Sequence, residues 1–128
     1  MSFATVSSAQ VHLLKTSLVR VEVDLSKGLN AFSIVGLPDK SVGEAKDRIS
    51  AAIKNTGFKS PKQKNHKVVI SLAPADTKKE GPSFDLPMAI GYLIASKCLP
   101  ADVKGKLFVG ELSLDGTVQG IDGVLPIV

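Results

Sequence analysis

Cysteine, tryptophan and histidine are nearly absent from this 128-residue sequence, which contains one Cys, no Trp and two His. The lone Cys98 cannot form an internal disulfide and suits a reducing cytoplasm, where we expect it to pack as a small apolar residue. His12 and His66 are far apart in sequence and lack cysteine companions, so we expect solvated side chains there. Neither a zinc site nor a His-based acyl-transfer site has its usual residues.

Aromatic residues make up only 5% of the chain, and the net charge is a modest +4. Few aromatics disfavour the stacking platforms that grip single-stranded nucleic acids, whereas a small basic excess permits contact with phosphates through Lys and Arg. No apolar run approaches the roughly 18 residues needed to cross a bilayer. We therefore expect a cytoplasmic chain without a membrane partner.

The sequence also lacks a phosphate-binding loop of the form Gly, four residues, Gly-Lys and Ser or Thr. It has no glycine-rich dinucleotide motif either. We therefore expect these residues to hold no cofactor and to hydrolyse no nucleotide. The nearest carboxylate pairs, Glu22 with Asp24 and Glu44 with Asp47, are predicted to lie on solvated surfaces rather than to perform acid-base chemistry.

The length and a hydrophobic content of 44% predict one domain, and the apolar patterns predict its strands. Residues 19–26 alternate apolar and polar side chains, which predicts a half-buried strand, and residues 31–35 predict a second strand antiparallel to it. Residues 68–72 are continuously apolar, which predicts a central strand. Residues 107–109 predict another buried strand.

Two helices are expected. The segment Ser41-Val42-Gly43-Glu44 has the pattern of a capping box, and Gly57 is the expected stop of the helix that begins there. Its apolar residues fall at helical spacing and are predicted to pack on a sheet with one side in water: Val42, Ala45, Ile49, Ala52 and Ile53. Residues 84–96 are apolar almost all round, which predicts a buried helix.

The pair Asp115-Gly116 predicts a β-hairpin within residues 112–118. A two-residue loop sets Ser113 opposite Val118, whereas a three-residue loop sets Leu114 opposite Val118. We favour the longer loop with a bulge, because it places two apolar residues opposite each other.

Ser83 is the one candidate nucleophile, because it lies just before the buried helix, where free amides favour a developing negative charge. The residue types alone favour the simpler interpretation that Ser83 is the N-cap. The segment Gly81-Pro82-Ser83, with the apolar helix and the Gly110-Glu111-Leu112 hairpin after it, resembles the Lon proteolytic domain.

The Lon resemblance places Ser83 at the nucleophile position and Leu125 at the position of the general-base Lys. Because leucine cannot accept a proton, we interpret Ser83 as a relic and expect no catalysis by this chain. Lys78 and Lys79 are predicted to lie on a polar loop where water solvates their charge, so neither is expected to replace the base.

Motifs along nearly the whole chain are similar to the N-terminal domain of the magnesium-chelatase-like ComM/YifB proteins. They include Ile34-Val35-Gly36-Leu37-Pro38-Asp39, Leu72-Ala73-Pro74-Ala75-Asp76, Phe84-Asp85-Leu86-Pro87 and Gly123-Val124-Leu125-Pro126. In that family a Lon-like domain precedes an AAA+ ATPase module that assembles into hexameric rings, and ComM acts as a DNA helicase in branch migration during natural transformation.

The resemblance implies an α/β (α+β) fold: one Lon-like domain over residues 1–128, with a mixed sheet, two main helices and a right-handed β-α-β crossover. ATP and Mg are then expected only in the AAA+ module, which residues 1–128 lack. The apolar end of the chain, residues 123–128, leads us to expect a truncation of a longer protein. The implied partners are that module, further copies of the chain in a homo-oligomeric ring, and DNA.

The sequence is consistent with two functions from different classes and, more weakly, with a third. The favoured function is that of a non-catalytic accessory domain of a ComM-type DNA helicase, serving ring assembly, DNA guidance or both. The alternative is a Lon-type Ser peptidase, which Leu125 disfavours; a RadA-type recombination protein is the third. A basic stretch without acidic residues supplies candidates for a weak, sequence-independent DNA contact: Lys59, Lys62, Lys64 and Lys67.

Overall fold

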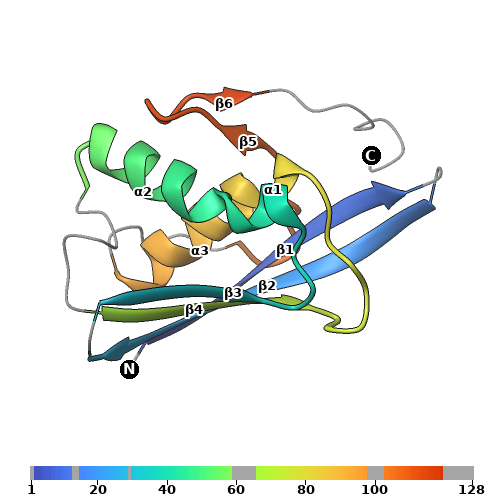
Figure 1. Ribbon diagram of the computed structural model, residues 1–128, viewed down its shortest axis with the longest axis horizontal. Coiled ribbons are helices and arrows are strands. Elements are labelled where there is room, and N and C mark those ends of the chain that lie inside the picture. The colour runs from blue at the N-terminus through green and yellow to red at the C-terminus, as the bar shows by residue number, and fades with distance from the viewer. Residues whose placement is uncertain (1, 13–14, 29, 59–65, 98–102, 120–128) are drawn as a thin grey trace.

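The computed structural model describes residues 2–12, 15–28, 30–58, 66–97 and 103–119 (Figure 1). Four strands form a mixed sheet in the order β1-β2-β4-β3, in which β1 and β4 are antiparallel to β2, and β3 is parallel to β4. Their bounds are Ser2–His12 for β1, Lys15–Lys27 for β2, Ala31–Val35 for β3 and His66–Ala73 for β4.

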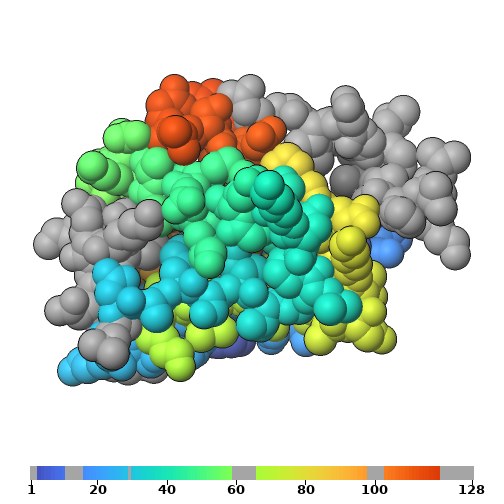
Figure 2. Space-filling model, viewed as in Figure 1, coloured from blue at the N-terminus to red at the C-terminus, as the bar shows by residue number. Residues whose placement is uncertain are grey.

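The helices lie over one face of this sheet, and a short hairpin lies above them (Figure 1). Figure 2 shows the hairpin, in orange, resting on α2, in green. The bounds are Lys40–Gly43 for α1, Ala45–Asn55 for α2, Pro82–Phe84 for the 3-10 helix η2, Asp85–Ala95 for α3, Glu111–Leu112 for β5 and Val118–Gln119 for β6. The expected α/β class is confirmed in its mixed sheet and two main helices.

The strand predictions are partly confirmed. Val19, Val21, Val23 and Leu25 of β2 are buried, as their alternation predicts, and β4 lies between β2 and β3, as its apolar run predicts. The predicted antiparallel pairing of β2 with β3 is wrong, because β4 separates them and pairs with β3 in parallel. The intervening residues of α1 and α2 supply the crossover that a parallel pair requires.

The first helix begins earlier than its predicted capping box. Asp39, rather than Ser41, is the N-cap, and its Oδ1 accepts a hydrogen bond from the Val42 amide at 2.8 Å. The predicted apolar stripe is buried throughout. At the other end, Gly57 has φ +96, and the amides of Gly57 and Phe58 donate to the carbonyls of Lys54 and Ile53. This pattern ends α2 where the glycine predicts.

Helix α3 is buried as expected and carries the centre of the core. Met88 and Tyr92 have no exposed surface, and α3 packs against β1 and β2. Phe84, the last residue of η2, is fully buried in the same core cluster. Gly91 permits this close approach, because a Cβ there would lie 2.7 Å from a methyl group of Val23. None of the helices within the described ranges is long and apolar enough to span a membrane.

Two predictions in the last third of the chain are corrected. Residues 107–109 do not form a buried strand, because Leu107 makes one isolated bridge to Ser7 at the sheet edge and is 45% exposed. The predicted hairpin exists, but Leu112 rather than Leu114 lies opposite Val118. The loop has three residues, 114–116, closed by a 2.9 Å hydrogen bond from the Ser113 amide to the Thr117 carbonyl.

Candidate functional site

Ser83 lies half-buried inside η2, at the junction between the loop that follows β4 and helix α3. Its carbonyl accepts a hydrogen bond from the Gly110 amide at 2.9 Å, and the Gly110 carbonyl accepts one from the Leu86 amide at 3.0 Å. The N-cap of α3 is Phe84, and no side-chain hydrogen bond caps this helix. The interpretation of Ser83 as the N-cap is therefore wrong. The Gly110 carbonyl, rather than a side chain, accepts from an amide in the first turn of α3, that of Leu86.

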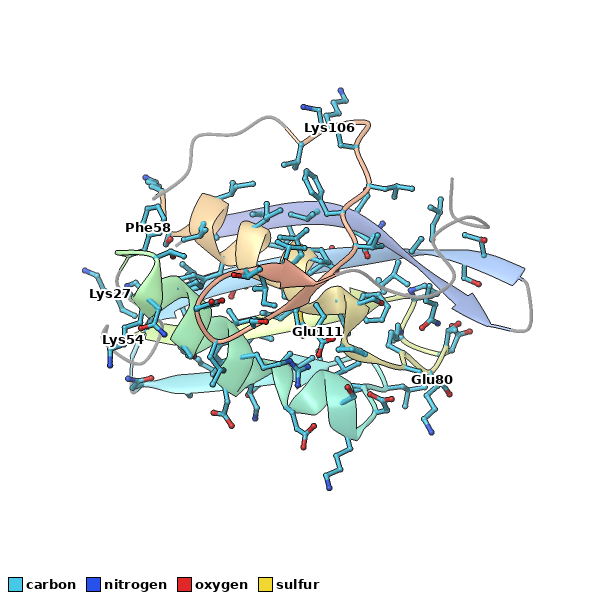
Figure 3. The ribbon with its side chains drawn as sticks, turned by 90° about the horizontal axis from the view of Figure 1, so that it is seen from above. Lys27, Lys54, Phe58, Glu80, Lys106 and Glu111 are labelled. Carbon is cyan, nitrogen blue, oxygen red and sulfur yellow. The ribbon has the colours of Figure 1, made fainter. Side chains whose placement is uncertain are left out.

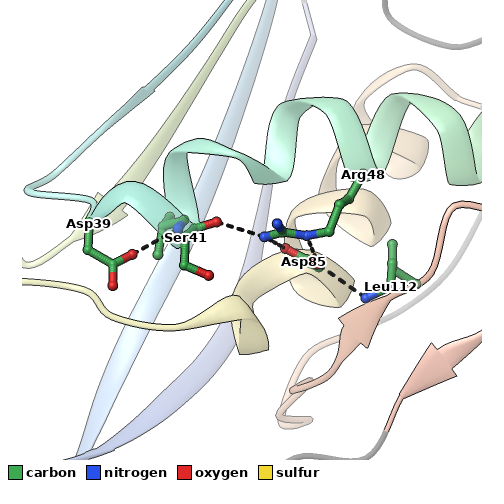
Figure 4. Close-up of polar contacts among 6 residues, drawn as sticks. Asp39, Ser41, Arg48, Asp85 and Leu112 are labelled. Carbon is green, nitrogen blue, oxygen red and sulfur yellow. Dashed lines mark hydrogen bonds and ion pairs between the residues drawn. The ribbon is translucent and has the colours of Figure 1, made fainter.

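The centre of this junction is an ion pair between α2 and α3 (Figure 4). The Asp85 carboxylate is buried and accepts hydrogen bonds from Arg48 Nε at 2.6 Å and Arg48 Nη2 at 2.9 Å. It also accepts one from the Leu112 amide of β5 at 3.1 Å, while Arg48 Nη2 donates to the Ser41 carbonyl of α1 at 2.7 Å. Two side chains thus join three helices and the hairpin.

The electrostatics of this pair favour a fixed structural role. The hydrogen bonds to Asp85 raise the pKa of Arg48 against the opposing effect of burial, and the charges of Asp85, Glu111 and Glu44 act in the same direction as those bonds. Both Asp85 oxygens are occupied by donors, so this carboxylate is not available as a general base. The bidentate geometry orients α2 relative to α3.

Sequence reasoning did not find this pair. Arg48 falls off the apolar stripe of α2, which is typical of a solvated residue, and Asp85 stands alone in an apolar segment. The isolated acid at the start of a buried helix was the available signal, because a carboxylate is rarely fully buried without a partner. The partner is 37 residues away, and the spacing along the chain does not indicate it.

Lys79 corrects a second prediction. Its side chain is fully buried rather than solvated, and Nζ donates a hydrogen bond to the Pro74 carbonyl. Its backbone pairs with the segment before α1: the Lys79 amide donates to the Leu37 carbonyl at 3.0 Å, and the Asp39 amide donates to the Lys79 carbonyl at 2.9 Å. Burial lowers the pKa of Lys79, and the nearby charge of Asp76 opposes that effect.

The lowered pKa of Lys79 makes stability depend on pH. Between that pKa and the ordinary value of 10.5, the unfolded chain binds more protons than the folded chain, so the free energy of unfolding rises with pH. Lys79→Met has no ammonium group at this position and therefore lacks this contribution to the pH dependence of the unfolding free energy. We expect the difference in unfolding free energy, parent minus variant, to increase with pH across that window in urea titrations. Lys78→Met, at an exposed position, is the control, and a difference for Lys79→Met that stays constant would contradict the prediction.

The predicted basic stretch is described only in part. Lys59, Lys62 and Lys64 lie outside the described residues, as do Leu125 and Cys98, whereas Lys67 is exposed on β4. Lys67 lies opposite Ser26 in the sheet, and the next pair along is Lys27 opposite His66. Figure 3 shows Lys27, Lys54 and Phe58 at this same end of the molecule. The structure thus adds two cations, Lys27 and Lys54, at the end of the molecule where Lys67 lies.

The remaining titratable groups form no further site in the part of the chain that is described. No three His, Cys, Asp or Glu side chains there come together to hold a metal ion. His66 is half-buried rather than fully solvated as predicted, and its Nδ1 atom is buried.

Comparison with known proteins supplies the family. The family model described as subunit ChlI of Mg-chelatase matches residues 21–128. The chain is 46% identical over its whole length to the competence protein ComM of Haemophilus influenzae and covers 25% of that protein. It is 45% identical over 84% of its length to YifB of Escherichia coli, of which it covers 21%. A Mycobacterium tuberculosis relative is 36% identical over the whole chain, again covering 25% of that protein.

The chain thus spans about a quarter of the length of these curated relatives. The matches to the Haemophilus influenzae and Mycobacterium tuberculosis proteins cover the whole chain, and with it every element described above. On this evidence the chain belongs to the ComM/YifB family of Mg-chelatase-like proteins.

Proposed function

We propose that this chain is a non-catalytic accessory domain of a ComM-type AAA+ DNA helicase, serving ring assembly, DNA guidance or both. The observation that carries the proposal is the 46% identity over the whole chain to a competence protein about four times as long. In the proposed full-length protein, ATP and Mg belong to the AAA+ module. Residues 1–128 lack a phosphate-binding loop and have Leu125 where the Lon resemblance places the general base.

The distribution of cations supports a role in DNA guidance. Lys27 ends β2, Lys54 lies in the last turn of α2, and Lys67 lies near the start of β4. All three are exposed, and in sequence Lys54 and Lys67 precede and follow residues 59–65, which contain Lys59, Lys62 and Lys64. Clustered cations attract phosphate without reading base sequence, and each contact releases a counterion. The proposed contact is therefore electrostatic and independent of DNA sequence.

The test is DNA binding by this chain, measured by fluorescence anisotropy on single-stranded and branched DNA across a salt series. We expect binding that weakens steeply with salt. Replacing Lys59, Lys62, Lys64 and Lys67 together with Ala is expected to reduce affinity about tenfold at low salt. The dependence of log K on log salt is expected to flatten by about 0.9 per lost contact with duplex DNA and by about 0.7 per lost contact with single strands.

A matched variant controls for net charge. Lys40, Lys78, Lys104 and Lys106 are four exposed lysines elsewhere on the molecule, and replacing them with Ala removes the same four charges from a chain of net charge +4. We expect this variant to keep most of the affinity of the parent. Equal affinity for the parent and the first quadruple variant would remove DNA guidance by these lysines from the proposal.

A further inference from the structure

A groove lies on the face of the sheet turned away from the helices. It has a volume of about 610 Å³, and its walls include Leu18 of β2, Pro74 and Leu107. Arg20, also in its lining, lies opposite Ser7 of β1 and Ala73 of β4, whereas its neighbours Val19 and Val21 are buried on the helix side. We call this surface the Leu18 groove.

The Leu18 groove combines apolar walls with positive charge. Leu18 and Leu107 are 69% and 45% exposed, which is a large exposure for leucines that line one concavity. Arg20 and Lys106 line the same groove, and both side chains are exposed. Arg20 Nε also forms an ion pair of 3.4 Å with Glu22 Oε2 on the same strand, so an acidic ligand shares this cation with Glu22. An apolar groove with cations at its rim fits a ligand that presents an apolar side chain next to an acidic one.

The tip of the β5–β6 hairpin presents those two groups in sequence. Leu114 is 57% exposed and is followed by the exposed Asp115. The loop is held in shape: Asn55 Nδ2 donates to the Leu114 carbonyl at 2.7 Å, and the Thr117 amide donates to Asp115 Oδ1 at 2.9 Å. The bond from Thr117 also lowers the pKa of Asp115. A preorganised loop loses little entropy on docking.

We propose that the hairpin tip of one copy of this chain docks into the Leu18 groove of a second copy. Leu114 then packs against Leu18 and Leu107, and the Asp115 carboxylate faces Arg20 and Lys106. The hairpin lies on the helix side of the sheet (Figure 1). Arg20 and the strand positions beside it belong to the opposite face, because Val19 and Val21 are buried on the helix side. One molecule therefore cannot make this contact with itself.

The contact uses two different surfaces, which makes it heterologous. Repeated head to tail, such a contact closes into a ring or continues as a filament. The inference therefore rests on the ring-assembly part of the proposed function and names its interface. A single loop in a groove buries less than the roughly 1,200 Å² of a stable complex, so we expect weak association that is strengthened when a ring closes.

Disulfide trapping tests the contact. Leu114→Cys and Leu18→Cys are made separately in a Cys98→Ser background, and the two proteins are mixed at high concentration in a glutathione redox buffer. We expect the mixed disulfide dimer to form about tenfold faster than the dimer of Leu114→Cys with Phe3→Cys, because docking holds the first pair of thiols together. Phe3, 60% exposed on β1, is a matched exposed apolar control.

Charge reversal separates this contact from adventitious collision. Adding Asp115→Lys to the Leu114→Cys protein is expected to abolish the tenfold advantage, and adding Arg20→Glu and Lys106→Glu to its Leu18→Cys partner is expected to restore it. A mixed dimer that forms no faster than the Phe3→Cys control overturns the proposal, as does predominance of the symmetric dimer of Leu114→Cys.

The outcome is independent of DNA. Trapping uses neither nucleic acid nor ATP, so a positive result with no DNA binding supports the interface and removes DNA guidance from the proposed function. A negative trapping result with intact, salt-dependent DNA binding overturns the interface and leaves DNA guidance in place.

Discussion

Asp85→Ala is expected to destabilise this domain by about 3 to 5 kcal/mol, the range for breaking a buried ion pair from one side. The substitution removes the carboxylate that accepts three hydrogen bonds. The largely buried Arg48 guanidinium and the Leu112 amide then lose this acceptor. Since small domains have total stabilities of only about 5 to 15 kcal/mol, the variant is expected to lie near the limit of folding.

Urea unfolding followed by far-UV circular dichroism measures this loss, because the chain has no Trp to report by fluorescence. Asp24→Ala, which removes an exposed carboxylate from β2, is the control and is expected to change stability by less than about 0.5 kcal/mol. The double variant Arg48→Met/Asp85→Leu is expected to regain part of the loss, because no unpaired buried charge remains. A cost below about 1 kcal/mol for Asp85→Ala would contradict the structural role of the pair.

The elements that sequence predicts well here are those specified by local periodicity. The alternation over residues 19–26 and the helical spacing from Val42 to Ile53 each identify a buried face, because the side-chain periods of strands and helices are fixed by backbone geometry. The hairpin was found for a similar reason, since Asp115-Gly116 is a local turn signal.

The errors concern long-range pairing. Nothing in residues 31–35 indicates that β4, more than 30 positions later, takes the place beside β2. The exposure of Leu107 depends on the sheet edge at Ser7, again a distant partner. Burial of Lys79 has the same origin, because the Leu37 and Asp39 backbone holds this residue against the body of the domain. Composition and spacing do not encode such contacts.

In the candidate site, too, the residue marked by its local sequence was predicted, and the residues joined by long-range contacts were not. Position 83 was identified from its sequence context, but the residues that organise its surroundings, Arg48 and Asp85, were missed because they meet only in the folded chain. Both oxygens of the Asp85 carboxylate in this junction already accept hydrogen bonds, which is the property of a scaffold rather than of a reacting centre. This agrees with the proposed non-catalytic role, in which exposed surfaces make the contacts: the hairpin tip, the Leu18 groove, and the end of the molecule that carries Lys27, Lys54 and Lys67.

Gly36→Ala is expected to cost about 4 kcal/mol or more, because the position requires glycine for two independent reasons. Gly36 follows β3 with φ +104, a conformation that costs a side-chain-bearing residue about 1 to 2 kcal/mol. A Cβ there would also lie 2.2 Å from the Leu72 carbonyl oxygen of β4. That atom is backbone in the middle of the sheet, so relief requires β3 and β4 to move apart.

Gly57→Ala separates the two reasons. Gly57 has φ +96, but a Cβ there meets nothing within 4 Å, so the substitution carries the conformational cost alone, about 1 to 2 kcal/mol. Urea unfolding of both variants gives the steric part as the difference between them. If Gly36→Ala is no less stable than Gly57→Ala, the close approach of residue 36 to β4 is contradicted. If Gly36→Ala is less stable by about 2 kcal/mol or more, the turn at residue 36 fixes the parallel pairing of β3 with β4, and with it the sheet on which α2 packs.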